Sequence, residues 1–164
     1  MGRKDRGGSV GTPATVALTR AGVRYAVRAY EHDPAAESFG LEAAEALGVD
    51  PARVFKTLLV DTGSGLAVGV LPVDRLLDLK AMASVLGAKR VTMADPTAAE
   101  RSSGYVVGGI SPIGQKRALP TVVDSSADEH DTVLVSGGRR GLDLELAPAD
   151  LVAVTAARRG PIAR

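Results

Sequence analysis

The sequence contains no cysteine and no tryptophan, and aromatic residues make up only 3% of its 164 residues. The absence of cysteine excludes disulfide bonds, cysteine-ligated zinc and a cysteine nucleophile. The two histidines, His32 and His130, are too few for a multi-histidine metal centre. The scarcity of aromatic side chains argues against a nucleic-acid-binding protein that stacks many bases on aromatic platforms. Because 45% of the residues are hydrophobic, the core must instead be aliphatic.

The sequence also lacks a hydrophobic run as long as a membrane span. Its charged residues 1–8 precede no hydrophobic stretch of the kind found in secretory signals, so we expect a cytoplasmic protein without membrane contact. Residues 3–6 and 158–164 carry a formal charge of +5, which leaves −4 for the rest of a chain whose net charge is +1. A body of this sign is not a general polyanion binder, so any nucleic-acid contact must use local patches. Besides the two ends, the candidates are Lys89-Arg90, Lys116-Arg117 and Arg139-Arg140, which are also typical of ordinary surface charge.

The hydrophobic periodicity and the helix-capping residues predict one α+β domain with a mixed sheet. Residues 1–11 are glycine-rich and charged and are interpreted as a disordered arm, residues 12–156 as the folded domain, and residues 157–164 as a basic C-terminal tail. Helices are expected over residues 12–22, 38–48, 78–87, from 95 onward, and over 148–157. Strands are expected over residues 24–31, 54–61, 66–71, 90–93, 106–110, 121–124, 132–135 and 142–146.

The most informative segment is the run GYVVGGISPIGQK at residues 104–116. Strand-like hydrophobic residues lead into Gly108 and Gly109, and Pro112 stiffens the exit. Glycine lets the backbone approach a ligand closely, and successive N–H groups in such a turn form a donor site for an oxyanion, carbonyl or phosphate. A tight loop between two strands fits the same residues equally well.

Lys56 stands within a strand whose two faces are both hydrophobic, and it shares one of these faces with Leu58. A strand of this kind is expected to be covered on both sides, so the lysine must be paired or must extend into a cleft. A desolvated lysine beside a pocket binds a carbonyl or phosphate. The alternative is an edge lysine that reaches solvent, and the sequence setting favours the functional interpretation.

Asp143 follows a second glycine-rich turn at residues 136–141, which could bring it to the same site. The alternation in residues 142–146 nevertheless predicts that Asp143 lies with Glu145 on a solvated face. Tyr30 and His32 are polar aromatic residues whose pattern favours a structural role over catalysis. Neither a Gly-x-Ser-x-Gly elbow nor a phosphate-binding loop of the Walker type occurs, so the sequence gives no support to a standard serine hydrolase or nucleotide hydrolase.

Six short runs occur together in a recognisable order and spacing: YEHDP (30–34), FKTL (55–58), LDLK (77–80), MADP (93–96), residues 104–116 and residues 135–143. As a set they closely resemble the YbaK type of Cys-tRNA(Pro) deacylase, in the superfamily that includes the editing domain of prolyl-tRNA synthetase. The resemblance covers about residues 12–156 and is most specific at residues 108–114. It implies a single α+β domain around a mixed, barrel-like sheet flanked by short helices.

The resemblance also implies an enzyme that acts in trans on mischarged Cys-tRNA(Pro), without cofactor or metal, alongside prolyl-tRNA synthetase. It assigns Lys56 to hold the phosphate of the 3′-terminal adenosine or the aminoacyl ester, and Gly108 to donate a backbone hydrogen bond near the scissile carbonyl. The positions that it assigns to substrate binding are Tyr30, Phe39, Thr57, Gly109, Ser136 and Asp143.

Such a site needs no protein nucleophile, because the thiol of the substrate's own cysteine can attack the ester carbonyl intramolecularly. Backbone donors around Gly108 and the charge of Lys56 would then stabilise the developing oxyanion. Two alternatives remain open at this point. One is a deacylase for Ala-tRNA(Pro) that uses water, and the other is a module that only binds the acceptor end of tRNA.

Overall fold

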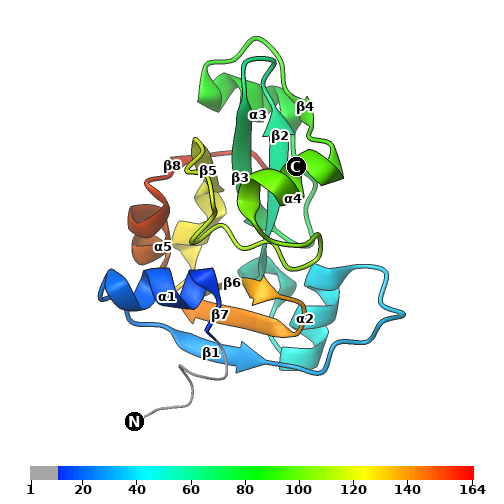
Figure 1. The fold of residues 1–164 in the computed structure, drawn as a ribbon, viewed down its shortest axis with the longest axis vertical. Coiled ribbons are helices and arrows are strands. Elements are labelled where there is room, and N and C mark those ends of the chain that lie inside the picture. The colour runs from blue at the N-terminus through cyan, green and yellow to red at the C-terminus, as the bar shows by residue number, and fades with distance from the viewer. Residues whose placement is uncertain (1–10) are drawn as a thin grey trace.

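The computed structural model describes residues 11–164 (Figure 1). The predicted arm, apart from Gly11, lies outside these residues. The α-helices of the described part are α1 (Pro13–Arg20), α2 (Phe39–Leu47), α3 (Leu79–Leu86), α4 (Pro96–Ser103) and α5 (Pro148–Thr155), and the short 3₁₀ helices are η1 (Pro51–Arg53) and η2 (Ser125–Glu129). Its strands are β1 (Ala26–Ala29), β2 (Phe55–Asp61), β3 (Leu66–Pro72), β4 (Thr92–Met93), β5 (Thr121–Asp124), β6 (Val133–Arg139), β7 (Leu142–Leu146) and β8 (Arg158–Gly160). None of the helices within residues 11–164 has both the length and the hydrophobicity to cross a membrane.

The strands form two sheets, which confirms the α+β class and the mixed pairing (Figure 1). The smaller sheet is antiparallel in the order β1-β7-β6. The larger sheet has the order β4-β2-β3-β5-β8, in which β2 is antiparallel to β3 and β4, whereas β5 is parallel to β3 and β8. A single parallel bridge between Val54 and Leu134 links the start of β2 to β6. The two sheets therefore meet at the N-terminal end of β2.

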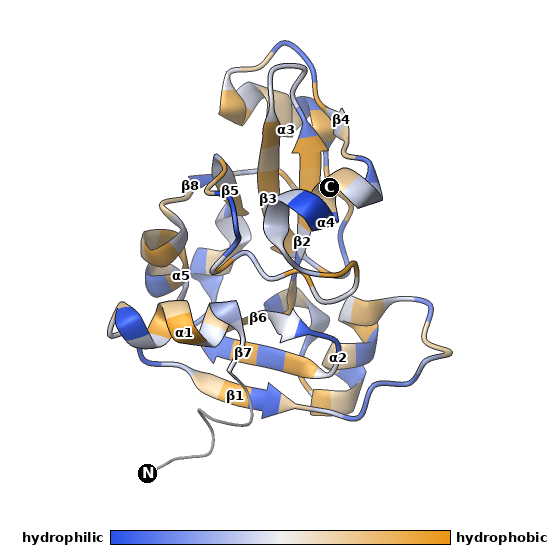
Figure 2. Ribbon diagram, in the orientation of Figure 1, coloured by the Kyte–Doolittle hydropathy of each residue, from blue (hydrophilic) through white to orange (hydrophobic). Residues whose placement is uncertain are grey.

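The core is aliphatic, as the composition predicts. The largest cluster packs Leu18 of α1 and Leu151 of α5 against inward residues of both sheets, such as Val70 and Leu144. A second cluster packs α3 against the β2–β3 hairpin around Met82. Figure 2 shows that β7 alternates between hydrophobic and hydrophilic residues along its length. Burial of these aliphatic side chains supplies the main driving force for folding.

The predicted helices are confirmed because their termination signals are local. The Ser38 side chain caps α2 by accepting a hydrogen bond from the backbone of Leu41, and Gly48 ends the helix in a left-handed conformation. Asp78 and Gly87 have the same roles in α3. The start of α2 bears directly on the site, because the cap at Ser38 fixes where the next residue, Phe39, enters the structure.

The strand predicted at residues 106–110 is wrong. These residues form a turn in which the Gly109 N–H donates to the Val106 carbonyl at 2.8 Å, and Val106 is 65% exposed. Gly104 and Gly108 have φ angles of +82° and +92°, which an extended strand does not allow. The glycines therefore override the hydrophobic pattern and place a loop beside α4 instead.

The C-terminal residues that the sequence sets apart as a tail pack within the domain. Residues 158–160 form β8, parallel to β5, although they carry two arginines and no hydrophobic alternation. One carboxylate oxygen of the buried Asp124 accepts hydrogen bonds from the backbone N–H groups of Ile162 and Ala163. This anchoring holds the last described residues against the larger sheet.

Candidate active site

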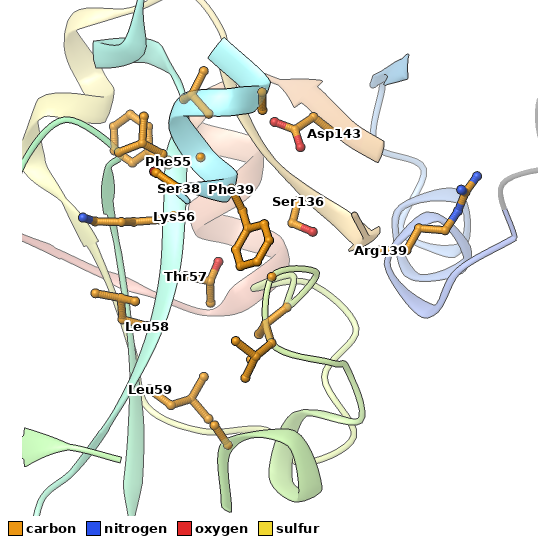
Figure 3. A pocket seen from close by; sticks show the side chains of 18 of the residues that line it. Ser38, Phe39, Phe55, Lys56, Thr57, Leu58, Leu59, Ser136, Arg139 and Asp143 are labelled. Carbon is orange, nitrogen blue, oxygen red and sulfur yellow. The ribbon is translucent and has the colours of Figure 1, made fainter. Parts of the chain in front are cut away.

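A cavity of about 430 Å³ opens where the first residues of α2, the strand β2, the loop 104–116 and the β6–β7 hairpin come together (Figure 3). Residues that are far apart in the sequence meet there. The structure places seven of the eight predicted site residues in its lining, namely Tyr30, Phe39, Lys56, Thr57, Gly108, Ser136 and Asp143.

Gly109 is the exception, since it is buried and does not line the cavity. A Cβ atom at this position would lie 2.7 Å from the Cα atom of Arg139, so a larger residue does not fit. Gly109 therefore allows the loop to pack closely against the β6–β7 hairpin, and the structure gives it no direct contact with the cavity.

Lys56 is the second residue of β2 and is partly exposed, whereas Phe55 and Leu59 of the same strand are buried. Burial lowers the pKa of Lys56, and the carboxylate of Asp74 opposes this shift. In Figure 3 the Lys56 and Leu58 side chains lie on one side of β2, and Thr57 lies on the other. The prediction that both faces of β2 are covered is therefore wrong at residues 56–58, where the cavity reaches the strand.

Thr57 carries a polar atom that the fold leaves without a partner. Its hydroxyl oxygen Oγ1 is buried and forms no hydrogen bond with any of residues 11–164. An unpaired buried hydroxyl is costly, which makes such an atom a candidate for binding a ligand. Figure 3 shows the Thr57 side chain on the same side of β2 as the ring of Phe39.

The loop around Gly108 presents a free backbone donor. Among the hydrogen bonds of residues 11–164, the Val107 N–H donates to Glu100 and the Gly109 N–H to Val106, but the Gly108 N–H has no partner. The φ angle of +92° favours glycine at this position, and a Cβ atom there would lie 2.5 Å from Nε of Arg140. The loop therefore needs glycine both for its conformation and for its packing.

Arg140 fixes this loop from the side of the hairpin. Its guanidinium donates to the Val107 carbonyl at 2.6 Å and lies 4.6 Å above the ring of Phe39. The resulting cation–π contact joins the start of α2 to the glycine loop. From the sequence, Arg140 is interpreted as half of a candidate nucleic-acid patch, Arg139-Arg140, or as ordinary surface charge. The signal that could have identified it was its place inside a glycine-rich turn next to Asp143.

Asp143 is only 5% exposed, so the predicted solvated position is wrong. The reason is that this face of the small sheet is covered, because Leu134, which shares the face with Asp143, packs against Ala43 of α2 and against Tyr30. Burial raises the pKa of Asp143 to about 7, against the opposing effect of the Arg28 charge. Burial, together with the nearby charge of Asp143, raises the pKa of Tyr30. Asp143 is also the register partner of Ser136 on β6, so the two residues form one wall of the cavity.

Glu145, two residues further along β7, connects the small sheet to η1. Its two carboxylate oxygens accept hydrogen bonds from Arg28 at 2.5 Å and from Arg53 at 2.8 Å. A hydrogen bond from Thr132 is the largest cause that lowers the pKa of Glu145, and the two arginines add to it. This network fixes β7, and with it Asp143, relative to the start of β2.

The chemistry of the cavity is that of an anion or carbonyl site. It offers a lysine, a free backbone N–H and a hydroxyl, with a carboxyl group whose pKa is close to neutrality. Within residues 11–164 no group of three or more histidine, aspartate or glutamate side chains could hold a metal ion. These groups can orient a polar ester and stabilise charge on its carbonyl oxygen.

Comparisons with known proteins show which family and which relatives this chain is similar to. A family model described as the aminoacyl-tRNA editing domain matches residues 33–154. A protein of Enterococcus faecalis with the provisional name Cys-tRNA(Pro)/Cys-tRNA(Cys) deacylase EbsC is 41% identical over 113 residues, which are 68% of this chain and 69% of that protein.

Two solved structures have the same fold over nearly the whole chain. The hypothetical protein APE2540 is 26% identical with a TM-score of 0.84, and the match covers 93% of this chain and all of that one. A proposed trans-editing enzyme for prolyl-tRNA synthetase is 24% identical with a TM-score of 0.83, and the match covers 96% of this chain and 98% of that one.

Proposed function

The chain belongs to the family of aminoacyl-tRNA editing domains, and we propose that it is a deacylase that removes cysteine from mischarged Cys-tRNA(Pro). The observation that carries the proposal is the meeting of Lys56 and the free N–H of Gly108 in one cavity, reached from separate segments of the chain. The provisional name of the Enterococcus relative supports cysteine as the amino acid.

In the proposed reaction the thiol of the bound cysteine attacks the carbonyl carbon of its own ester. A carbon–sulfur bond forms, the bond to the 3′-oxygen of the ribose breaks, and that oxygen takes up the thiol proton. The products are a cyclic thiolactone and tRNA with a free 3′ end. The intramolecular attack benefits from a high effective concentration of the thiol.

The residues of this chain position the ester and stabilise charge. The N–H of Gly108 donates to the developing oxyanion, and Lys56 holds the aminoacyl ester or the negatively charged terminal phosphate. Tyr30, Phe39, Thr57, Ser136 and Asp143 enclose the aminoacyl group. An enzyme of this kind would act in the cytoplasm alongside prolyl-tRNA synthetase, which is the expected partner.

The test is release of labelled cysteine from Cys-tRNA(Pro) by the intact protein, by Lys56→Ala and by a control, Lys80→Ala. Lys80 is exposed on α3 and does not line the cavity. We expect activity in the intact protein and in the control but not in Lys56→Ala. Release of alanine from Ala-tRNA(Pro) but not of cysteine would contradict the proposed specificity, and tRNA binding without turnover on either substrate would indicate a binding module.

The thiol-assisted step has its own test, which is the same assay with Ser-tRNA(Pro). Serine has a hydroxyl in place of the thiol and is a much weaker nucleophile. If serine is released as fast as cysteine, the intramolecular attack is wrong even though the deacylase function stands.

A further inference from the structure

The strand β2 has a gap in its pairing at the floor of the cavity. Its edge toward β3 is paired along the whole strand, but on the opposite edge β4 reaches only Val60 and Asp61, and β6 reaches only Val54. Residues 56–58, which lie between these contacts, are partly exposed and line the cavity. The edge of β2 that faces away from β3 is therefore unpaired over a length of about one residue pair.

The hydrogen bonds that flank this gap fix the direction of the backbone groups within it. The Val54 carbonyl accepts from the N–H of Val73 after β3, whereas the Leu59 carbonyl accepts from the N–H of Ala94 on the opposite edge. Since the direction alternates along a strand, the N–H and the C=O of Thr57 both point to the open edge. The register gives Thr57 no strand partner there. Such groups need a partner in water or in a ligand.

We propose that the edge of β2 at Thr57 binds the main chain of the aminoacyl group as a one-residue β-strand. The α-ammonium group donates to the Thr57 carbonyl, and the ester carbonyl accepts from the Thr57 N–H. In an antiparallel hydrogen-bonded pair, two residues exchange both of their backbone hydrogen bonds. An aminoacyl ester carries a donor and an acceptor in this same relation, so it fits a gap of one residue. The proposal rests on the deacylase function and names how its substrate is held.

This pairing also orients the rest of the substrate. Directly opposed residues of an antiparallel pair have their side chains on the same face, so the cysteine side chain lies with the unpaired hydroxyl of Thr57. The ester oxygen and the ribose extend toward the N-terminal end of β2, beside Lys56. The carbonyl then receives two backbone donors, from Thr57 and from Gly108, as in an oxyanion hole.

Proline substitutions along β2 test the backbone donor. Thr57→Pro removes an N–H that faces the open edge, which is where a strand tolerates proline. We expect this variant to fold and to deacylate Cys-tRNA(Pro) about 100-fold more slowly than the intact protein. The matched control is Leu58→Pro, whose N–H faces β3, and which we expect to lose its thermal transition.

Two results of this series would overturn the inference. In the first, the folded Thr57→Pro variant deacylates Cys-tRNA(Pro) as fast as the intact protein. The deacylase function would then stand without the proposed pairing. The other is an equal loss in Thr57→Val, which keeps the N–H and removes only the hydroxyl. An intact protein without activity on any aminoacyl-tRNA would instead refute the proposed function, and this inference with it.

A change in the substrate tests the backbone acceptor without altering β2. 3-Mercaptopropionyl-tRNA(Pro) keeps the thiol and the ester but lacks the α-amine, and we expect its kcat/KM to be about 10- to 100-fold lower. The ratio of kcat/KM for Cys-tRNA(Pro) to kcat/KM for this analogue should be the same in Asp143→Asn, because the amine is bound by the Thr57 carbonyl. If this ratio falls to one in Asp143→Asn, Asp143 binds the amine and the proposed pairing is wrong.

Discussion

Replacing Asp143 by asparagine is expected to make the stability of the protein less dependent on pH. The pKa of Asp143 is about 7 in the folded protein, against an ordinary value of 3.8. Between these two values the folded state keeps a proton that the unfolded state releases, so stability falls as pH rises from about 4 and levels off above about 7. Integrated from pH 5 to pH 8, the loss is about 2.5 kcal/mol.

Asparagine has nearly the same shape and does not ionise, so this variant lacks that loss. We expect the melting temperature of Asp143→Asn, relative to the intact protein, to rise by roughly 5–10 °C between pH 5 and pH 8. Tyr30, whose pKa is raised from its ordinary value of 10.0, stays neutral over this pH range and does not interfere. Thermal unfolding across this pH range is the assay, and Asp131→Asn on the exposed surface is the control. A difference between variant and intact protein that stays constant with pH would refute the reasoning.

Three further substitutions probe the loop, the C-terminal anchor and the ion-pair network. Gly108→Ala introduces a Cβ atom 2.5 Å from a guanidinium nitrogen at a φ of +92°, so we expect about 100-fold slower deacylation and about 1–2 kcal/mol lower stability, measured by turnover and by denaturant unfolding. Asp124→Ala leaves the buried N–H of Ile162 and the partly buried N–H of Ala163 without their acceptor and is expected to cost about 3 kcal/mol, so an unchanged melting temperature would contradict the anchoring role. Glu145→Gln should cost about 1–2 kcal/mol at pH 7. Because the pKa of Glu145 is lowered from 4.5, that cost should decrease as the pH falls below 4.5 toward the lowered folded value, and a series of urea titrations from pH 7 downward measures it.

The helices could be predicted from the sequence because their signals are local. Ser38 and Gly48 mark the ends of α2 within eleven residues, and no distant contact is needed to interpret them. The strand β8 could not be predicted, since its sequence Arg158–Gly160 becomes a strand only by pairing with β5 more than thirty residues earlier. The strand predicted at residues 106–110 is wrong for the opposite reason. Its valines follow a strand pattern, but the backbone conformation of its glycines prevents a strand.

The candidate site shows the same division between local and distant causes. Lys56 could be predicted because a charge inside a hydrophobic strand is visible in seven residues of sequence. The burial of Asp143 could not, because it depends on the distant helix α2 and Tyr30, which cover this face of the small sheet. The contact of Arg140 with Phe39 joins residues a hundred positions apart, and no period in the sequence connects them. Seven of the eight residues that the resemblance assigned to the site line the cavity, and only the fold shows which groups face one another.

The gap in the pairing of β2 also bears on how this protein avoids aggregation. An open strand edge is a template on which a second chain can add a strand and begin to aggregate. Here the unpaired stretch lies at the floor of a cavity that Phe39 helps to enclose, and β4 and β6 close it at either end. An extended segment of several residues cannot lie along so short an opening, whereas a single amino acid can. The walls of the cavity thus also keep this strand edge away from a second chain, and we expect their removal to expose a template for intermolecular β-sheet.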